Sequence, residues 1–208
     1  MPPRVSDDYL EARREQILEA AAVCFSRKGF HKTTMRDICR KSSMSPGALY
    51  RYFSGKEEII KAMVEQTLER NTGILREAGE KSDTFNALEE LADIFFGMME
   101  DPKKHIIRLD IELWAEALRN RKIMRILRRS LANHRKELMD IIRRAQLGGS
   151  MREDVEPEAV ARVMISFFDG LTLQKGIDPK TDIWSYVAVI KLMMAGLFEN
   201  EKGRERCE

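Results

Sequence analysis

Two helix-start signals stand close together near the N-terminus, and they constrain the fold more than any other feature of the sequence. Thr34, with Asp37 three residues later, and Ser45, followed by Pro46, are residue types that begin helices. Because an α-helix takes about 3.6 residues per turn, the chain between the two signals has room for a helix of only about two turns. We therefore predict two very short helices that meet at a tight turn.

The remainder of the chain also carries helical periodicity. Apolar residues recur at helical spacing, sustained alternation is missing, and most prolines fall at helix-start positions. Gly29 ends the first helix, and Ser54 with Glu57 is interpreted as a capping box at the start of the fourth. The predicted helices cover about residues 7–28, 34–41, 45–51, 54–78, 84–100, 103–118, 120–146, 157–175 and 181–200. The sequence therefore predicts an all-α fold of about nine helices, in which an N-terminal three-helix module is joined by a continuous helix to a larger helical domain.

Charge is distributed unevenly along the 208 residues, although the net charge of the chain is only +2. Residues 1–56 hold 11 Lys and Arg against 6 Asp and Glu, a net of +5, and residues 57–208 hold 25 against 28, a net of −3. A basic N-terminal part and a slightly acidic remainder suit a protein whose N-terminal module meets phosphate groups.

The composition also indicates the compartment. The three cysteines, Cys24, Cys39 and Cys207, are scattered, which favours a reducing cytoplasm over a disulfide framework. No apolar run approaches the roughly 18–20 residues of a membrane span, and the acidic first residues, including Asp7 and Asp8, exclude a signal peptide. We expect a cytoplasmic protein with no membrane partner.

Patterns for metal binding or catalysis are missing from the sequence. The histidines, His31, His105 and His134, lie far apart and lack neighbouring ligands at metal-site spacing, and no nucleophile or phosphate-loop motif occurs. Glu112 and Glu116 share one helical face and are interpreted as a solvated or ion-paired surface. We predict no metal, no cofactor and no catalytic residue.

The second short helix has the features of a helix that enters the major groove of DNA. Its leading end carries only small side chains, and tyrosines and cations that suit phosphate oxygens stand around it. The apolar residues of the module are interpreted as its core: Phe30, Ile38, Leu49 and Phe53. The candidate DNA-binding residues are Thr34, Arg36, Ser45, Pro46, Gly47, Tyr50, Arg51, Tyr52 and Lys56.

Several stretches within residues 13–65 repeat a known pattern: Ile17-Leu18-Glu19-Ala20-Ala21, Phe25 before Gly29-Phe30, Thr33-Thr34-Met35-Arg36-Asp37-Ile38, and Gly47-Ala48-Leu49-Tyr50-Arg51-Tyr52-Phe53 with Lys56-Glu57. In these stretches the chain resembles the TetR (tetracycline-repressor) family of bacterial regulators. One departure is Ser43, which occupies a turn position where the family usually has Gly. A left-handed backbone there would cost Ser about 1 kcal/mol relative to Gly.

The resemblance implies domains 1–56 for DNA binding and 57–200 for effector binding and dimerisation, and the charged segment 201–208 is expected to be disordered. The resemblance also implies a homodimer formed by the last two helices. The surplus apolar surface and the small residues of these helices support the same expectation. The alternative is that this apolar surface packs inside a single subunit. The interface candidates are Phe167, Gly170, Leu171, Leu192, Ala195 and Gly196. It also implies a ligand cavity among the middle helices, whose apolar stripes are otherwise read as plain core. The cavity candidates are Phe95, Met99, Leu109, Leu113, Trp114, Leu127, Leu131, His134, Met164 and Phe168.

The function that follows is that of a ligand-responsive transcriptional regulator, expected to be a repressor, that binds a palindromic operator in double-stranded DNA as a dimer. A bulky, mostly apolar effector, such as a fatty-acyl derivative, an aromatic or a drug-like molecule, would release it. Two alternatives are a helical carrier of lipids or drugs whose N-terminal module no longer reads DNA, and an all-helical enzyme.

Overall fold

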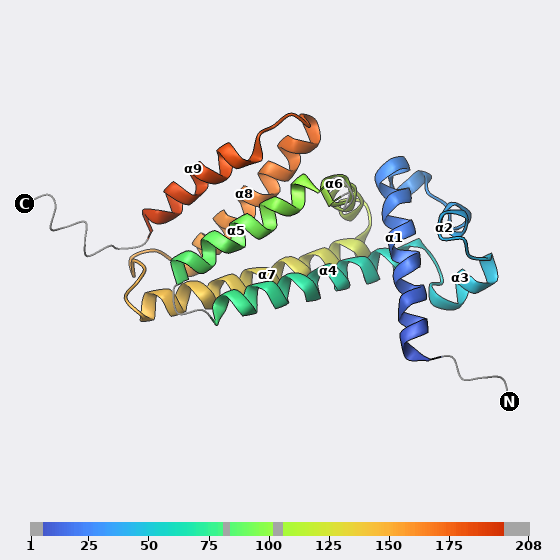
Figure 1. The fold of residues 1–208 in the computed structure, drawn as a ribbon, viewed down its shortest axis with the longest axis horizontal. Coiled ribbons are helices and arrows are strands. Elements are labelled where there is room, and N and C mark those ends of the chain that lie inside the picture. Colours follow the sequence, from blue (N-terminus) through green and yellow to red (C-terminus); the bar gives the residue numbers. More distant parts are fainter. Residues whose placement is uncertain (1–5, 81–83, 102–105, 198–208) are drawn as a thin grey trace, which may run out of the picture. The chain divides into compact units, whose positions relative to one another are not determined.

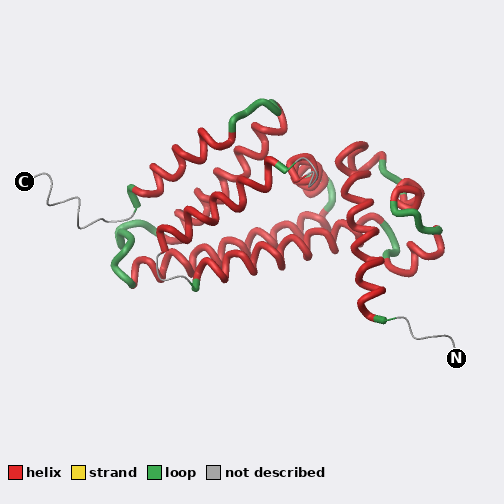
Figure 2. Tube along the Cα trace, viewed as in Figure 1, coloured by secondary structure: helices red, strands yellow, loops and turns green. Residues whose placement is uncertain are grey.

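The computed structural model describes residues 6–80, 84–101 and 106–197, and in this part of the chain every element is an α-helix (Figures 1 and 2). The helices are α1 (Asp7–Lys32), α2 (Met35–Lys41), α3 (Pro46–Tyr52), α4 (Lys56–Gly79), α5 (Thr84–Glu100), α6 (Ile106–Ala117), α7 (Arg121–Leu147), α8 (Pro157–Ile177) and α9 (Ile183–Ala195). The predicted all-α fold of about nine helices is confirmed. None of the helices in the described ranges combines the length and the apolar character that a membrane span requires.

The chain divides into two compact units. Unit 1 comprises Met1–Thr67 and Arg108–Arg128, and unit 2 comprises Leu68–Ile107 and Arg129–Glu208. The division falls inside helices, because α4, α6 and α7 each contribute residues to both units. The predicted domains 1–56 and 57–200 stay predictions, and the predicted tail 201–208 lies outside the described residues.

Unit 1 is built around a core that α1, α2, α3 and the first part of α4 supply. All four side chains predicted for this core are buried: Phe30, Ile38, Leu49 and Phe53. They pack with residues of α1 and with Ile123 at the beginning of α7. The short helices α2 and α3 therefore owe their stability to this packing, since isolated helices of about two turns do not persist in water.

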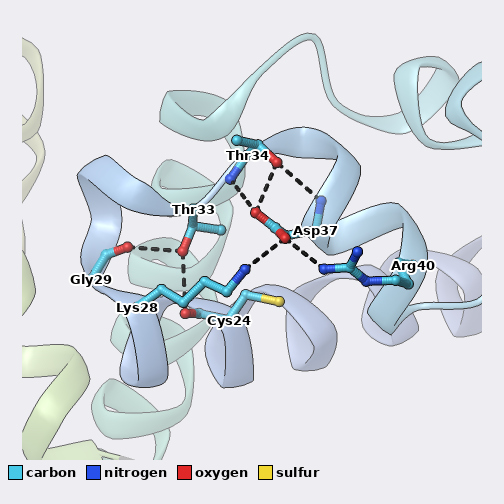
Figure 3. A network of polar contacts seen from close by, with 7 residues as sticks. All are labelled: Cys24, Lys28, Gly29, Thr33, Thr34, Asp37 and Arg40. Atoms are coloured by element: carbon cyan, nitrogen blue, oxygen red, sulfur yellow. Dashed lines mark hydrogen bonds and ion pairs between the residues drawn. The ribbon is translucent and has the colours of Figure 1, made fainter.

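A kink at Gly29 interrupts α1 near its C-terminal end. The backbone φ of Gly29 is 76°, outside the helical region, and the chain then adds a last short turn that ends at Lys32. Thr33, which is fully buried, closes this turn because its hydroxyl donates to the carbonyl oxygens of Gly29 (2.8 Å) and Cys24 (3.2 Å), as Figure 3 shows. The helix end predicted at Gly29 is thus present as a kink.

Unit 2 packs α5, α8 and α9 with the second part of α4 and most of α7. Helices α5 and α8 run in the same direction, since Phe95 and Phe168 have ring centroids 6.1 Å apart and Glu100 pairs with Lys175 at 3.0 Å. Helix α9 runs opposite to α5, since Trp184 lies against Gly97 and Lys191 pairs with Asp93 at 2.8 Å. The apolar stripes predicted for these helices meet in one core.

Candidate nucleic-acid interface

The N-terminus of α2 carries a complete capping box. The Thr34 hydroxyl accepts a bond from the backbone N–H of Asp37 (3.2 Å), and the Asp37 carboxylate accepts from the backbone N–H of Thr34 (3.0 Å) and from its hydroxyl (2.8 Å; Figure 3). Two N–H groups that would lack helical partners are thereby satisfied. The predicted start of α2 is confirmed, and Thr34, a DNA-binding candidate, holds this start in place.

Asp37 also joins α1 to α2. Its carboxylate pairs with Lys28 on α1 at 2.7 Å and with Arg40 on α2 at 2.8 Å (Figure 3). The hydrogen bond from Lys28, followed by those from Thr34, holds the pKa of the Asp37 carboxyl well below its ordinary value. The group is therefore an anion at physiological pH, and it fixes the two helices at their solvent side.

The turn between α2 and α3 contains the strained residue that the sequence predicts. Ser43 has φ of 55°, and it is the non-glycine residue with positive φ in the described part of the chain. The turn is held on both sides, since the Ser42 N–H donates to Ile38 O (2.8 Å) and the Met44 N–H donates to Cys39 O (3.0 Å). From α1, the Gln16 amide donates to Ser42 O at 2.7 Å. The surrounding bonds impose the left-handed conformation on a serine.

Helix α3 presents its leading end to solvent. The Ser45 hydroxyl caps it by accepting from the Ala48 N–H at 3.2 Å, and Pro46 occupies the first helical position. A Cβ added at Gly47 would meet no atom within 4 Å. Leu49 is fully buried, whereas Tyr50 is 54% exposed. The helix is thus anchored by one face and bare on the other, as a helix that enters a groove must be.

The other candidates occupy different environments. Arg36 on α2 and Arg51 on α3 are exposed, and Tyr52 is half-buried against the core of unit 1. The Lys56 ammonium donates to the carbonyl oxygens of Phe30 (2.8 Å) and His31 (3.3 Å) and lies 4.7 Å from the Phe30 ring centroid. Lys56 therefore ties the start of α4 to the end of α1, and its predicted phosphate contact stays a prediction.

The capping of α4 differs from the sequence interpretation. The Ser54 N–H and hydroxyl both donate to the Glu58 carboxylate, at 2.6 and 2.7 Å. Glu57, the predicted partner, accepts instead from Asn120 (3.0 Å) and Lys122 (3.2 Å). The prediction of Glu57 as the box residue was wrong because these groups, which follow α6 in the chain, compete for its carboxylate.

Two carboxylates of α6 bind the turn that follows the kink in α1. Glu112 accepts a hydrogen bond from the Phe30 backbone N–H at 3.0 Å, and a Cβ at Gly29 would lie 3.1 Å from its oxygens. Glu116, which is buried, lies 2.9 Å from Nε2 of His31, an ion pair when the imidazole is protonated. The interpretation of the two residues as a solvated or ion-paired surface is right only for the ion pair of Glu116, whose partner is His31, whereas Glu112 binds a backbone N–H. Their spacing on one face was visible in the sequence, but a partner 82 residues away was not.

Two family models match the chain. The model of bacterial regulatory proteins of the tetR family matches residues 17–63, and the model described as BetI-type transcriptional repressor, C-terminal, matches residues 88–197. The second match alone spans more than half of the chain. The chain belongs to the TetR family. It is accordingly a DNA-binding transcriptional regulator and not an enzyme.

Individual relatives agree with this assignment. The TetR-family chain is 27% identical to the transcriptional regulator UidR of Escherichia coli over 188 residues, which cover 88% of this chain and 92% of UidR. It is 31% identical to the regulator YfiR of Bacillus subtilis over 120 residues, a match that spans only 58% of either chain. The solved structure of GusR from Salmonella enterica has a TM-score of 0.77 and 28% identity, and the match covers 94% of this chain and 98% of GusR.

The candidate effector residues of this TetR-family protein are divided between the two units. Leu109, Leu113 and Leu127 pack against the core of unit 1. In unit 2, Met99 is a buried core residue and Phe95, Met164 and Phe168 pack against that core. Trp114 and Leu131 are half-buried, and the buried Nε2 atom of His134 has no hydrogen-bond partner among the described residues.

The candidate interface residues also fall into different environments. Leu192 is 74% exposed, and Ala195 at the end of α9 and Gly196, which caps the helix, are exposed as well. On α8, Phe167 and Gly170 are half-buried, whereas Leu171 is only 4% exposed and belongs to the core of a single chain. Among the described residues, no group of three or more side chains suits a metal ion.

Proposed function

We propose that this TetR-family protein is a ligand-responsive repressor that binds a palindromic operator as a homodimer and is released by a bulky, mostly apolar effector. The observation that carries the proposal is the exposed leading end of α3, anchored through Leu49 and free of bulky side chains at Gly47. The match to the repressor model over residues 88–197 supports the sign of regulation.

The surface of α3 supports a role in reading DNA. Arg51 is exposed and has a guanidinium that suits the O6 and N7 atoms of guanine, a pairing worth about 1–3 kcal/mol of discrimination. The exposed Tyr50 hydroxyl suits a phosphate oxygen, which positions the helix without reading sequence. A pair of such helices would have to stand about 34–36 Å apart to enter successive major grooves, which a two-fold dimer achieves.

The apolar outer face of the last two helices supports the dimer. The inner face of α9 is buried through Ile183, Val187, Ile190 and Met194. Large apolar side chains on α8 and α9 nevertheless remain exposed: Val163, Leu173, Ile177, Trp184, Val189, Leu192 and Met193. Exposed apolar surface of this extent on adjacent helices is typical of an interaction site, and a second copy would cover it.

The bonds between α6 and the end of α1 support a route for the effector signal. Glu112 and Glu116 hold the backbone of Phe30 and the ring of His31, and the same turn supplies the carbonyls that bind Lys56. A displacement of α6 would therefore act on the segment that ties α1 to α4. Allosteric couplings typically amount to about 1–3 kcal/mol, or 5–150-fold in affinity.

Selection of operators from random duplexes by the purified full chain tests the proposal. We expect an enriched palindrome whose half-sites are about one helical turn apart, with Arg51→Ala relaxing the preference at one base position of each half-site. Arg129→Ala, which removes an exposed cation from unit 2, serves as the matched control. Failure to enrich any duplex would contradict the proposal and favour the alternative of a carrier.

A further inference from the structure

Two buried polar atoms of unit 2 have no hydrogen-bond partner among the described residues: Oδ1 of Asn71 on α4 and Nε2 of His134 on α7. A buried donor or acceptor without a partner costs about 1–3 kcal/mol, so folded proteins rarely keep one without a reason. Neither residue belongs to the DNA-reading surface, and each lies in the part of the chain where an effector site is proposed. The pair therefore calls for a functional explanation.

The register of α4 and α7 brings the two residues to the same level. The two helices run in the same direction within unit 2, because Arg76 pairs with Glu137 at a separation of 61 residues along the chain. Three residues further on, the position of a Cβ on Gly79 lies against side-chain atoms of Ile141 and Arg144. Neighbours on the two helices thus differ by about 61–65 in number, and Asn71 and His134 differ by 63.

The two groups of the pair are themselves uncharged. Burial lowers the pKa of the His134 imidazole, so the ring is neutral at physiological pH and one of its nitrogens carries a proton. Asn71 has a neutral amide whose oxygen can only accept. Ile74, one turn from Asn71, packs against the apolar core of unit 2. Burial alone, with no charged neighbour, accounts for the lowered pKa of His134, and a charge buried without a partner is unfavourable.

We propose that Asn71 and His134 together bind a hydroxyl group on an otherwise apolar effector. A hydroxyl satisfies both atoms at once, because its proton is donated to Asn71 Oδ1 while its oxygen accepts from the protonated Nε2 of His134. A carboxylate or an ether has no proton to donate and would leave Oδ1 unsatisfied. This assignment rests on the proposed function of unit 2 as the effector site, and it narrows the effector to alcohols and phenols.

Matched pairs of small molecules test the proposal. The probes are 4-ethyl-, 4-butyl- and 4-octylphenol, each with its methyl ether, and binding to the full chain is followed by calorimetry. We expect at least one phenol to bind at least about tenfold more tightly than its ether, and Asn71→Leu and His134→Leu each to bring this ratio close to one. Asn133→Leu, which changes an exposed amide next to His134, should keep the wild-type ratio.

Equal binding of phenols and ethers, binding of neither, or a ratio that survives both substitutions would overturn the proposal. The double variant Asn71→Leu/His134→Leu gives an independent test without any probe. It should melt no lower than the wild type, since it removes two unsatisfied polar groups and adds apolar contacts. A clear fall in melting temperature would mean that both groups already have partners within the protein.

The failure of this inference can be told apart from the failure of the proposed function. Operator selection with the wild-type chain, in the absence of any probe, tests DNA binding alone. A chain that selects an operator but does not distinguish phenol from ether refutes only the hydroxyl site. A chain that distinguishes them but selects no operator refutes only the regulatory function.

Discussion

Units 1 and 2 differ in the hydrogen-bond partners of their buried polar groups. In unit 1 the protein itself supplies most of the partners: Thr33 donates to two carbonyls, the Gln16 amide donates to Ser42 O, and Glu112 accepts from the Phe30 N–H. In unit 2, Asn71 Oδ1 and His134 Nε2 have no such partner among the described residues. Unit 1 also holds one such atom, Oε2 of Glu116, but a protonated His31 lies 2.9 Å from it and forms an ion pair. Unit 2 differs because its two unpartnered groups are neutral, and we propose that a bound molecule supplies their partner.

The two units also differ in the side chains that they expose to solvent. Unit 1 exposes polar and aromatic groups around α3, while unit 2 exposes large apolar side chains along α8 and α9. One unit is thus suited to a charged, hydrated partner and the other to an apolar one.

Disruption of the apolar outer face of α9 should have the largest effect. Leu192→Arg places a cation where a second copy is proposed to pack, so the dimer should dissociate and lose the gain from binding two half-sites together. Operator affinity is then expected to fall by about 10²–10⁴-fold, with analytical ultracentrifugation reporting a monomer. Lys180→Ala, an exposed change in the loop before α9, is the control. A variant that stays dimeric would refute the assigned face.

Neighbouring residues of α3 should separate folding from DNA binding. Leu49→Ala removes a fully buried side chain and is expected to lower the free energy of unfolding by about 2–5 kcal/mol. Tyr50→Ala, at an exposed position, should change it by less than about 0.5 kcal/mol yet weaken operator binding. Denaturant unfolding and gel-shift titration measure the two effects. Intact affinity in Tyr50→Ala would argue against the assigned phosphate contact.

Removal of the Glu112 carboxylate on α6 should show how much its hydrogen bond to the Phe30 N–H contributes to the stability of unit 1. Glu112→Ala leaves the Phe30 N–H without its acceptor, and we expect a loss of about 1–3 kcal/mol in the free energy of unfolding. Glu19→Ala, which changes an exposed glutamate of the same unit, should cost less than about 0.5 kcal/mol. Equal effects in the two variants would show that the bond to Phe30 contributes nothing to stability.

A smaller and opposite effect is expected at the turn before α3. Ser43→Gly relieves the positive φ and should raise the free energy of unfolding by up to about 1 kcal/mol. Ser43→Ala keeps a Cβ in the same conformation and should bring no such gain. Thermal unfolding of the two variants measures the difference. If Ser43→Ala were stabilised as much as Ser43→Gly, the gain would not come from relief of the positive φ.

The smallest effect should appear only in acid. Because burial lowers the pKa of His134 below its ordinary value of 6.5, the unfolded chain takes up a proton near that pH while the folded chain does not. Stability should therefore fall as pH decreases below 6.5 and should be unaffected by this group above it. His134→Leu should flatten this part of the melting curve against pH. Parallel curves for the two proteins would contradict the buried, neutral imidazole.

Local signals in the sequence predicted most of the helices and part of the interface. The caps at Thr34 and Ser45 and the strained turn at Ser43 depend on residues a few positions apart, so the sequence contains the whole cause. The partner of Ser54 was misassigned because Asn120 and Lys122 donate to the Glu57 carboxylate, and Ser54 bonds to Glu58 instead. Pairings of this length cannot be read from periodicity, which states only which face of a helix is apolar.

The same limit applies to the residues that carry the further inference. The sequence singled out His134 but gave no sign that Asn71 lies at the same level on α4, because the offset between α4 and α7 emerges only once both helices are packed. Leu171 likewise belongs to an apolar stripe whose inner and outer sides cannot be distinguished without α5 and α9. What the sequence leaves open is which side of each helix meets which neighbour.

Helix α9 has apolar side chains on both its buried and its exposed face, which has a consequence for the stability of the protein at low concentration. Side chains such as Val189 and Met193 would be covered by a second copy only in the folded state, so association would draw the folding equilibrium toward the native form by mass action. The melting temperature should then rise with protein concentration. A cell that makes few copies of this regulator would hold it closer to its unfolding threshold, and its abundance would help to set its own lifetime.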